Sequence, residues 1–187
     1  MADRFVRLAR LGDVPSLTQV QQRCWADAPG MPPGTPTPNP AESERAWERA
    51  ILAPPSPRHQ VWVAIEGDEI VGLAALAPAP DPDLEAQTDS ELIVLAVDPA
   101  HRRQGHASRL LSASMQSLTD SAGRTATAWV NASDDASRRF LETAGWGVDD
   151  AHRSLTIDDD GVDVGTATLR QIRMGTDLSL TEPADSP

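Results

Sequence analysis

The sequence predicts a mixed α/β domain, and three observations support this prediction. Seven short segments have the alternating or continuous apolar pattern of β-strands. Four other segments repeat apolar residues at the 3.6-residue period of amphipathic helices. The chain has 187 residues and no visible internal repeat, which is enough for one domain with a substantial core.

The N-terminal part predicts a strand followed by two helices. Residues 4–9, RFVRLA, alternate between polar and apolar side chains. Asp13 can cap the first helix, with Pro15 tolerated in its first turn. Residues 28–40 are rich in proline and glycine and predict a long surface loop, after which a second helix covers 42–52. The predicted inner faces of the two helices are Leu17, Val20 and Cys24, then Trp47, Ala50 and Ile51.

The middle of the sequence predicts a hairpin, an acidic loop and a buried strand. The hairpin covers residues 60–78, with its turn at Gly67 and Asp68. The loop that follows, APDPDLEAQTDS, combines acidic residues with prolines. Residues 91–97, ELIVLAV, are almost continuously apolar, as expected for a strand covered on both faces.

The next part predicts two helices separated by a buried strand. One helix starts after Gly105, and the strand covers 125–130. The other helix covers 134–144 and ends at Gly145. The predicted inner faces are Ala107, Leu110, Leu111, Met115 and Leu118 on the first helix, and Ala136, Phe140, Leu141 and Ala144 on the second.

The chain is expected to end in a hairpin and a disordered tail. Strands at 153–157 and 166–174 flank the turn sequence DDDG. Residues 175–187 carry little apolar content and are expected to be disordered. The single folded domain is therefore predicted to cover 4–174.

Composition excludes several classes of function. The formal charge of −12, from 28 acidic residues against 16 basic ones, argues against a nucleic-acid partner. All basic residues are arginine, so no Walker A lysine and no Schiff-base lysine is available. Cys24 is the only cysteine and cannot form an internal disulfide. The sequence contains neither an apolar run of membrane-spanning length nor a secretory signal, so we expect a cytoplasmic protein without a membrane partner.

The stretch VDPAHRRQGHASRLL, residues 97–111, joins a strand to a helix through a glycine. The first amides of a helix lack intrahelical partners, and the helix dipole makes that end positive. Gly105 allows close approach of an anion, and Arg102 and Arg103 add charge, so the turn is a candidate phosphate or pyrophosphate site. The alternative is an ordinary strand-to-helix turn. A dinucleotide fingerprint would need G-x-G-x-x-G near the first strand, and a P-loop would need Gly-Lys; the chain has neither.

The same stretch resembles the acetyl-CoA signature of the GNAT superfamily of acyl-CoA N-acyltransferases. The family signature is Gln/Arg-x-x-Gly-x-Gly/Ala, and Arg102, Gly105 and Ala107 match it. The segment NASDDASRRFLETAGW resembles the second cofactor motif of the family, and the hairpin VWVAIEGDEIVGLAAL fits as well. The resemblance implies a mostly antiparallel sheet of about seven strands with about four helices. It also implies a splayed V between the fourth and fifth strands.

The resemblance also implies an acetyl-CoA site, and the spacing of the histidines gives no reason to expect a metal. The amides around Gly105 would hold the pyrophosphate, and the exposed edge of the fourth strand would pair with the pantetheine arm. Asn131 and the start of the following helix would line the far side of the slot. The residues expected to bind the cofactor are Leu95, Ala96, Val97, Arg102, Arg103, Gln104, Gly105, His106, Ala107, Ser108, Asn131 and Ala136.

Acyl transfer to an amine depends mainly on a base. An amine with a pKa near 10.4 costs roughly 4.6 kcal/mol to deprotonate at pH 7, whereas a thiolate with a thiol pKa near 8.5 is reprotonated with a favourable bias of about 2 kcal/mol. Glu91 is the candidate general base, because it starts the fourth strand and is expected to share a face with Ile93 and Leu95. The alternative is a solvated carboxylate at a strand end. The amide of Val97 is the candidate oxyanion donor.

One departure from the family pattern concerns the acid. Many members place a tyrosine four residues before the Gly-aromatic pair, but this position is Leu141 and the chain has no tyrosine. Ser137 is a weak substitute; otherwise water protonates the thiolate, or the protein is a poor catalyst. A CoA-binding regulatory module and a different kind of nucleotide-binding domain therefore remain as alternative functions.

The histidines and tryptophans point mostly to structural roles. The four histidines fit no metal-ligand spacing, and His101 and His106 are expected at the surface. Trp129 and Trp146 are expected in the core. Trp25 and Trp62 either pack in the core, which we favour, or line an acceptor pocket.

The acceptor amine is expected to enter between the 28–40 loop and the last hairpin, by resemblance to the family. The acidic segment DPDLEAQTDSE suggests a cationic amine of a small molecule or peptide, although a solvated acidic loop explains the same residues. The last strands could also support a homodimer, as they do in relatives.

Overall fold

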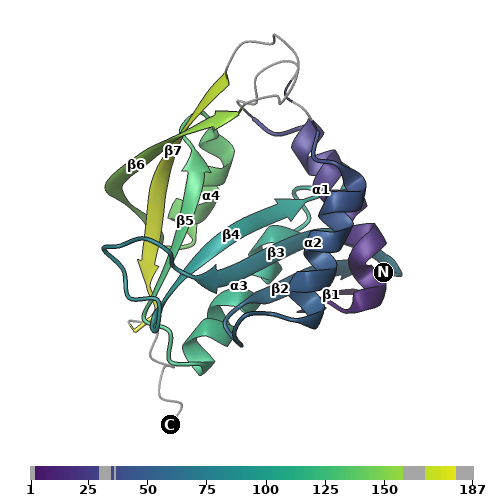
Figure 1. The fold of residues 1–187 in the computed structure, drawn as a ribbon, viewed down its shortest axis with the longest axis horizontal. Helices are drawn as coiled ribbons and strands as arrows, with labels where there is room; N and C mark the ends of the chain where they lie inside the picture. The colour runs from purple at the N-terminus through teal and green to yellow at the C-terminus, as the bar shows by residue number, and fades with distance from the viewer. Residues whose placement is uncertain (1–2, 30–34, 36, 158–166, 180–187) are drawn as a thin grey trace.

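The computed structural model describes residues 3–29, 35, 37–157 and 167–179. It forms a seven-stranded sheet flanked by helices (Figure 1). The elements are β1 (Arg4–Leu8), η1 (Leu11–Asp13), α1 (Val14–Ala26), α2 (Pro40–Leu52), β2 (Gln60–Glu66), β3 (Glu69–Pro78), β4 (Asp89–Val97), η2 (Pro99–His101), α3 (His106–Asp120), β5 (Thr125–Asn131), α4 (Asp135–Thr143), β6 (Gly147–Ile157) and β7 (Ala167–Asp177). This order confirms the predicted mixed α/β architecture. The DDDG turn and part of the 28–40 loop lie outside the described residues.

The strand order is β1-β2-β3-β4-β5-β7-β6, and every neighbouring pair except β4 and β5 is antiparallel. The hairpin of β2 and β3 turns at Gly67, as predicted. The mostly antiparallel seven-stranded sheet and its four α-helices are thus confirmed.

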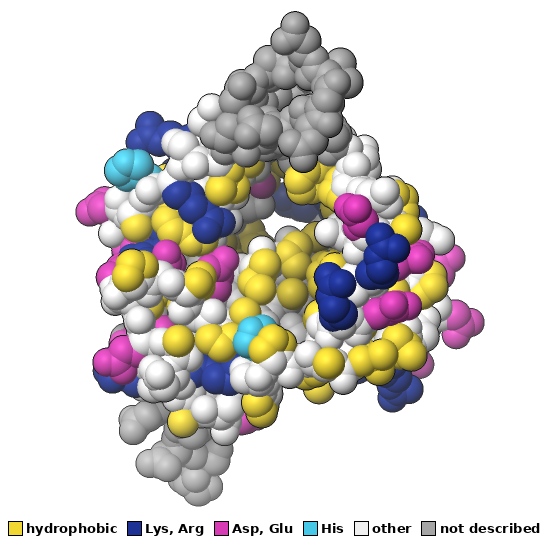
Figure 2. Space-filling model, viewed as in Figure 1, with side chains coloured by type: hydrophobic (Ala, Val, Ile, Leu, Met, Phe, Trp, Pro, Cys, Tyr) yellow, Lys and Arg dark blue, Asp and Glu magenta, His cyan; other side chains and the backbone are white. Residues whose placement is uncertain are grey.

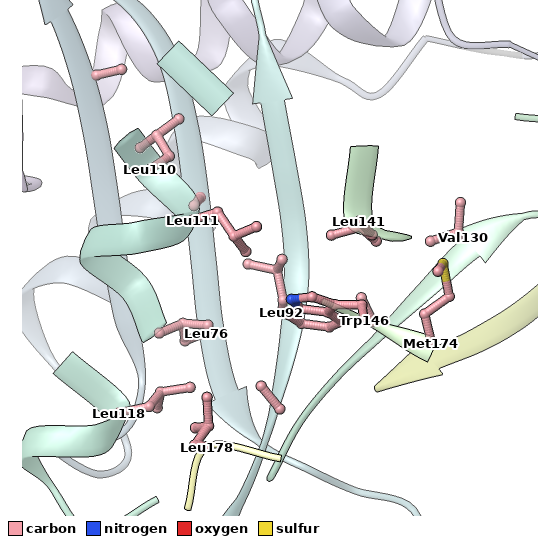
Figure 3. Close-up of a cluster of buried hydrophobic side chains, with 14 of the residues drawn as sticks. Leu76, Leu92, Leu110, Leu111, Leu118, Val130, Leu141, Trp146, Met174 and Leu178 are labelled. Carbon is pink, nitrogen blue, oxygen red and sulfur yellow. The ribbon is translucent and has the colours of Figure 1, made fainter. Parts of the chain in front are cut away.

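Two apolar clusters lie on opposite faces of the sheet. On one face, Leu17 and Val20 of α1 pack on Val63 and Leu73 of the β2–β3 hairpin. On the other face, a larger cluster joins α3 and α4 to the sheet (Figure 3). Its labelled members are Leu76, Leu92, Leu110, Leu111, Leu118, Val130, Leu141, Trp146, Met174 and Leu178. The helices α1 and α2 therefore cover only the β1–β4 half of their face, as Figure 1 shows.

The strands β4 and β5 are paired over only three residues. Residues 89–91 lie opposite 125–127, and beyond Glu91 the two strands separate. A β-bulge in β4 accompanies this separation, because Leu76 faces Leu92 while Ala75 faces Val94. Bulges bend a strand and end its pairing, which explains the predicted V.

The bulge corrects one prediction about Glu91. A strict alternation would place Glu91 on the same face as Ile93 and Leu95. The extra residue, Ile93, is 57 % exposed and shifts the alternation by one position. Glu91 instead shares its face with Val94 and Ala96, toward α1, while Leu92 and Leu95 face α3.

Several other predictions need correction. Asp13 precedes α1, but its carboxylate accepts hydrogen bonds from Arg7 and from the amide of Arg10 rather than capping that helix. Ala136 on α4 and Ala144 directly after this helix are exposed, because the short helix turns Leu141 toward the core instead.

The C-terminal boundary also lies later than expected. The strand β7 continues to Asp177 and Leu178 is 5 % exposed, so folded structure extends past residue 174 into the predicted tail. Residues 180–187 lie outside the described part of the chain. Among the helices that the structure describes, none has the length and apolar content required to span a membrane.

Candidate functional site

The open edge of β4 lies where β5 turns away. The amide of Asp98 donates to the carbonyl of Val71 at 2.9 Å, which makes the opposed residues Val97 and Gly72 a non-hydrogen-bonded pair. The N–H and C=O of Val97, and likewise those of Leu95, therefore point toward the gap left by β5. The backbone groups of Ala96 point to Leu73 on β3 instead, so the prediction that its backbone is exposed needs correction.

The turn after η2 carries the amides predicted to bind an anion. Gly105 adopts φ +83°, and Arg103 adopts φ +63°. The amides of residues 104–108 donate to no acceptor within the described part of the chain, and the first helical bond of α3 runs from the amide of Arg109 to the carbonyl of Gly105. Five successive N–H groups are therefore available at the N-terminus of a 15-residue helix.

Arginine side chains hold this turn in place. The Arg109 guanidinium donates to the carbonyl of Gln104 at 3.1 Å and would be the nearest neighbour of a Cβ at position 105. Arg102 donates to the carbonyl of Val97 at 3.2 Å and forms an ion pair with Asp27 at the end of α1. The guanidinium of Arg102 is thus engaged in holding the end of β4. Arg103 is exposed and has no hydrogen bond or ion pair with any described residue.

The structure corrects the prediction that His106 lies at the surface. Its side chain is 2 % exposed, and its Nε2 lies 3.1 Å from Oε2 of Glu66. Arg4 donates to the same carboxylate and to Oε1 of Gln104, both at 2.7 Å. The hydrogen bond from Arg4 lowers the pKa of Glu66. The turn predicted to bind an anion is therefore held by Arg4 of β1 and Glu66 of β2, two residues that lie outside the sequence motif.

Glu91 is buried at the vertex of the V. It is 8 % exposed, and its Oε2 has no hydrogen-bond partner in the described residues. Burial raises the pKa of this carboxyl, while the positive charge of Arg153 opposes that rise. A raised pKa makes this carboxylate a stronger base than an ordinary glutamate, and its burial distinguishes it from a solvated strand end.

The face of β5, β7 and β6 that continues from Glu91 is polar. Residues of one face stand opposite each other in the register: Trp129 opposes Arg173, and Asn131 and Arg153 both oppose Gln171. Trp129 is only half-buried there, so it is not the core residue that the sequence predicts. The Arg153 guanidinium stacks on its ring at 4.4 Å. The expected core role holds for Trp146, which is 4 % exposed, and Trp62 packs against the α3 cluster.

Two carboxylates of the acidic loop before β4 form ion pairs with a buried arginine of β7. Arg173 forms ion pairs with Asp81 at 3.3 Å, with Asp83 at 2.5 Å and with Asp149 on β6 at 2.7 Å. This loop crosses β7 in Figure 1. The sequence shows only the acidic run; the buried arginine that engages it comes from a distant strand.

The far side of the gap is lined by β5 and the start of α4. The Asn131 side chain donates to the carbonyl of Pro29 at 3.3 Å and accepts from Gln171 at 3.1 Å. Ser137 donates its hydroxyl proton to Asp134 at 2.6 Å, so the proton of this weak acid candidate is already engaged. Leu141 is 4 % exposed in the core.

Figure 2 shows the molecule hollowed between the half that carries β5, β6 and β7 and the half that carries α1 and α2. Hydrophobic side chains lie on the floor of this hollow. A family model for the acetyltransferase (GNAT) family matches residues 17–146, which is more than half of the chain. The chain belongs to the GNAT family of acetyltransferases. It is therefore an acyltransferase by family.

Solved structures similar to this GNAT protein support the fold. The ribosomal-protein-S18-alanine N-acetyltransferase from Escherichia coli is 17 % identical with a TM-score of 0.68, covering 98 % of this chain and 99 % of that one. An N-acetyltransferase from Staphylococcus aureus Mu50 is 21 % identical with a TM-score of 0.69, covering 94 % and 99 %. The protein yncA from Salmonella typhimurium, solved with its cofactor acetyl-CoA, is 19 % identical with a TM-score of 0.68, covering 98 % and 97 %. No curated protein matches the chain.

The GNAT frame separates the predicted site residues into two groups. The first group lies along the gap between β4 and β5: the open edge of β4, the turn at 102–108 and, where the two strands separate, Glu91. The second group lies on α4. Ala136 is exposed on α4, and Ser137 is bonded to its own helix cap. The sequence did not predict that Trp129, Arg153 and Arg173 lie beside this gap. The only indication in the sequence is that each is a charged or large aromatic residue within a predicted strand.

Proposed function

We propose that this GNAT protein transfers an acetyl group from acetyl-CoA to the primary amine of a small molecule or peptide, by direct attack within a ternary complex. The observation that carries the proposal is a combination of two features: the amides of residues 104–108 have no acceptor among the described residues, and β5 leaves the edge of β4 beyond Glu91 unpaired. Acetyl-CoA supplies an acyl group activated as a thioester.

The residues present fit the two parts of acetyl-CoA. The amides of 104–108 and the positive end of α3 suit a pyrophosphate, and Gly105 leaves the approach free of a backbone Cβ. The outward N–H and C=O groups of Leu95 and the outward N–H of Val97 suit an amide-containing arm lying along the strand, while the Val97 carbonyl already accepts from Arg102. The amide of Val97, the expected oxyanion donor, lies six residues from Glu91 along β4, roughly 15–20 Å at about 3.3 Å per residue. It is therefore too far from Glu91 to donate to the same reacting carbonyl, and we assign it to the arm instead.

Glu91 is the proposed general base. The ammonium group of the acceptor first gives one proton to the Glu91 carboxylate. As the neutral nitrogen attacks, the new C–N bond forms and the C–S bond breaks. The sulfur leaves as a thiolate, and the second proton of the nitrogen passes through water to that thiolate. Burial of Glu91 and the free Oε2 support this role, because a raised pKa lessens the mismatch with an ammonium group.

No tyrosine is available to protonate the leaving sulfur. Leu141 is buried against the core, and the Ser137 hydroxyl is engaged by Asp134. A thiol pKa near 8.5 makes reprotonation by water favourable by about 2 kcal/mol at pH 7, so the proposal needs no dedicated acid.

Two measurements test the proposal. Calorimetric titration with acetyl-CoA, ATP and NAD should show binding of acetyl-CoA alone. A thiol-release assay with a panel of primary amines should then show acyl transfer. Binding of ATP or NAD in place of acetyl-CoA would contradict the assignment of the turn.

A second candidate function is a CoA-binding regulatory module, and the buried Leu141 at the position of the family tyrosine is the observation that favours it. Such a module would bind acetyl-CoA in the calorimeter and release no thiol with any amine. The thiol-release screen therefore separates the two functions.

A further inference from the structure

Three polar groups near the vertex of the V have unused hydrogen-bonding capacity. The Oε2 atom of Glu91 and the Nε1 atom of Trp129 are buried without a partner among the described residues. The guanidinium of Arg153 uses Nε to donate to Gln171 at 2.8 Å, and its terminal nitrogens have no acceptor in the described part of the chain. Buried polar groups in folded proteins are nearly always paired, so this concentration of unpaired groups marks a place where a ligand supplies the partners.

The three groups lie on one face of the sheet. Glu91 stands opposite Thr127, and Trp129 follows Thr127 by two residues and so points to the same face. Arg153 reaches the same place from β6, because its guanidinium stacks on the Trp129 ring and its charge acts on Glu91. At about 3.3 Å of rise per residue, the Glu91 and Trp129 positions are roughly 7 Å apart along the strands. A ligand that contacts both has the size of an amino acid.

Arg153 differs from its neighbour Arg173 in its charge balance. Arg173 is 6 % exposed and forms ion pairs with Asp81, Asp83 and Asp149. Arg153 forms no ion pair with any described residue, although it is half-buried against Trp129. A fixed, half-buried guanidinium with free terminal N–H groups suits a carboxylate, which accepts two parallel hydrogen bonds from it.

The geometry points to an acceptor that carries a carboxylate near its primary amine, as a free amino acid does, with Arg153 binding the carboxylate. This inference rests on the proposed acetyl transfer and names its substrate class. The amine lies toward Glu91, and the Trp129 N–H is the second donor to the acid group. This acceptor class takes the place of the cationic acceptor that the acidic loop suggested. Asp81 and Asp83 of that loop form ion pairs with Arg173, so their charge is already neutralised within the protein.

The test uses pairs of acceptors that differ only in the acid group: each standard L-amino acid and its primary carboxamide. In the thiol-release assay the intact protein should favour at least one acid over its amide by about 10- to 100-fold in kcat/KM. Arg153→Met keeps an apolar contact with Trp129 but removes the charge, and should abolish the preference through KM with kcat little changed. Arg170→Met is the matched control, because Arg170 is exposed on the opposite face of β7 and opposes Ser154.

A binding measurement decides the inference even without turnover. Tryptophan fluorescence of the CoA-saturated protein should respond to the same amino acids, less to their amides, and not in Arg153→Met. Amides that bind or react as well as the acids, a preference that survives in Arg153→Met, or no response to any acid would overturn the inference. Acid binding without thiol release would instead contradict the proposed transfer and leave the Arg153 site standing.

Discussion

Glu91 of β4 lies opposite Thr127 of β5, and these are the last residues at which the two strands remain neighbours. The carboxylate is therefore buried at the point where the sheet opens. One structural feature accounts for both the open strand edge and the unpaired acid. The bulge at Ile93 ends the pairing and turns Glu91 toward the α1 face.

Replacing Glu91 by glutamine should lower kcat by about 10²- to 10⁴-fold, the usual contribution of a general base. Because burial raises the pKa of Glu91, the activity of the unmodified protein should rise with pH through a value above that of an ordinary glutamate. The pH profile of kcat/KM measures this limb, which should vanish in Glu91→Gln. Glu85→Gln, an exposed change in the preceding loop, serves as control. Full activity of Glu91→Gln over the whole pH range would exclude Glu91 as the base.

The same substitution should make the protein more stable at neutral pH. A carboxyl whose folded-state pKa is raised binds more protons when folded, so stability falls as pH rises from the unfolded pKa through the folded one. Glu91→Gln removes this loss, and its Tm should exceed that of the unmodified protein at pH 8 and match it more closely at pH 4. If the Tm difference between Glu91→Gln and the unmodified protein were the same at pH 8 and pH 4, burial of the Glu91 carboxylate would not destabilise the folded protein.

Gly105→Ala should weaken acetyl-CoA binding. The φ of +83° costs a non-glycine residue about 1–2 kcal/mol, and the new Cβ would lie 3.1 Å from Nη1 of Arg109. Gly67→Ala is a matched control, because Gly67 has φ +60° in the β2–β3 turn with no atom near the added Cβ. Both variants should lose similar Tm, but calorimetry should show weaker acetyl-CoA binding only for Gly105→Ala. Equal acetyl-CoA affinity in the two variants would show that the turn at Gly105 does not contact acetyl-CoA.

Arg173→Met should loosen the acidic loop before β4. The arginine holds Asp81 and Asp83 against β7, and its hydrogen bond lowers the pKa of Asp83. Hydrogen exchange of the amides in residues 81–88 should speed up, while Arg170→Met on the opposite face should not change it.

The pH dependence of this ion pair has a definite sign. A lowered folded-state pKa stabilises the protein above the unfolded value and loses that effect as pH falls through the folded one. The Tm difference between Arg173→Met and the unmodified protein should therefore shrink in acid. A Tm difference that stays constant down to the lowest pH at which the protein remains folded would point to packing of the arginine rather than to its charge.

Leu141→Tyr should not increase kcat by more than about tenfold, because a thiolate of this pKa leaves without a dedicated acid. The larger side chain should cost about 1–3 kcal/mol in the packed core around Leu141. Leu141→Phe carries the same packing cost without a hydroxyl and is the control in single-turnover assays. A rise in kcat of a hundredfold in the tyrosine variant alone would show that protonation of sulfur limits the reaction.

The elements of the fold could be predicted because most follow local rules. The 3.6-residue period of α3 and the turn residues at Gly67 need no tertiary information. The bulge in β4 could not be predicted, since ELIVLAV reads the same with or without it. That single insertion reverses the face of every residue on one side of it, so the predicted neighbours of Glu91 were wrong.

The geometry of the turn at Gly105 was the most predictable part of the candidate site, because a glycine followed by a helical pattern is visible in the sequence. Its binding of an anion stays a prediction. The buried His106 was not, because its partner Glu66 is 40 positions away and only the sheet brings the two together. Arg153 and Trp129 meet through the β5–β7–β6 register for the same reason.

The most direct test of the central claim follows the amide resonances of residues 104–108 by NMR while acetyl-CoA is added. If these N–H groups hold the pyrophosphate, their signals should shift far more than those of the turn at Gly67, the other glycine with a positive φ used as a control above, and should saturate with the calorimetric affinity. Amides at 104–108 that stay unshifted while acetyl-CoA binds elsewhere would contradict the account.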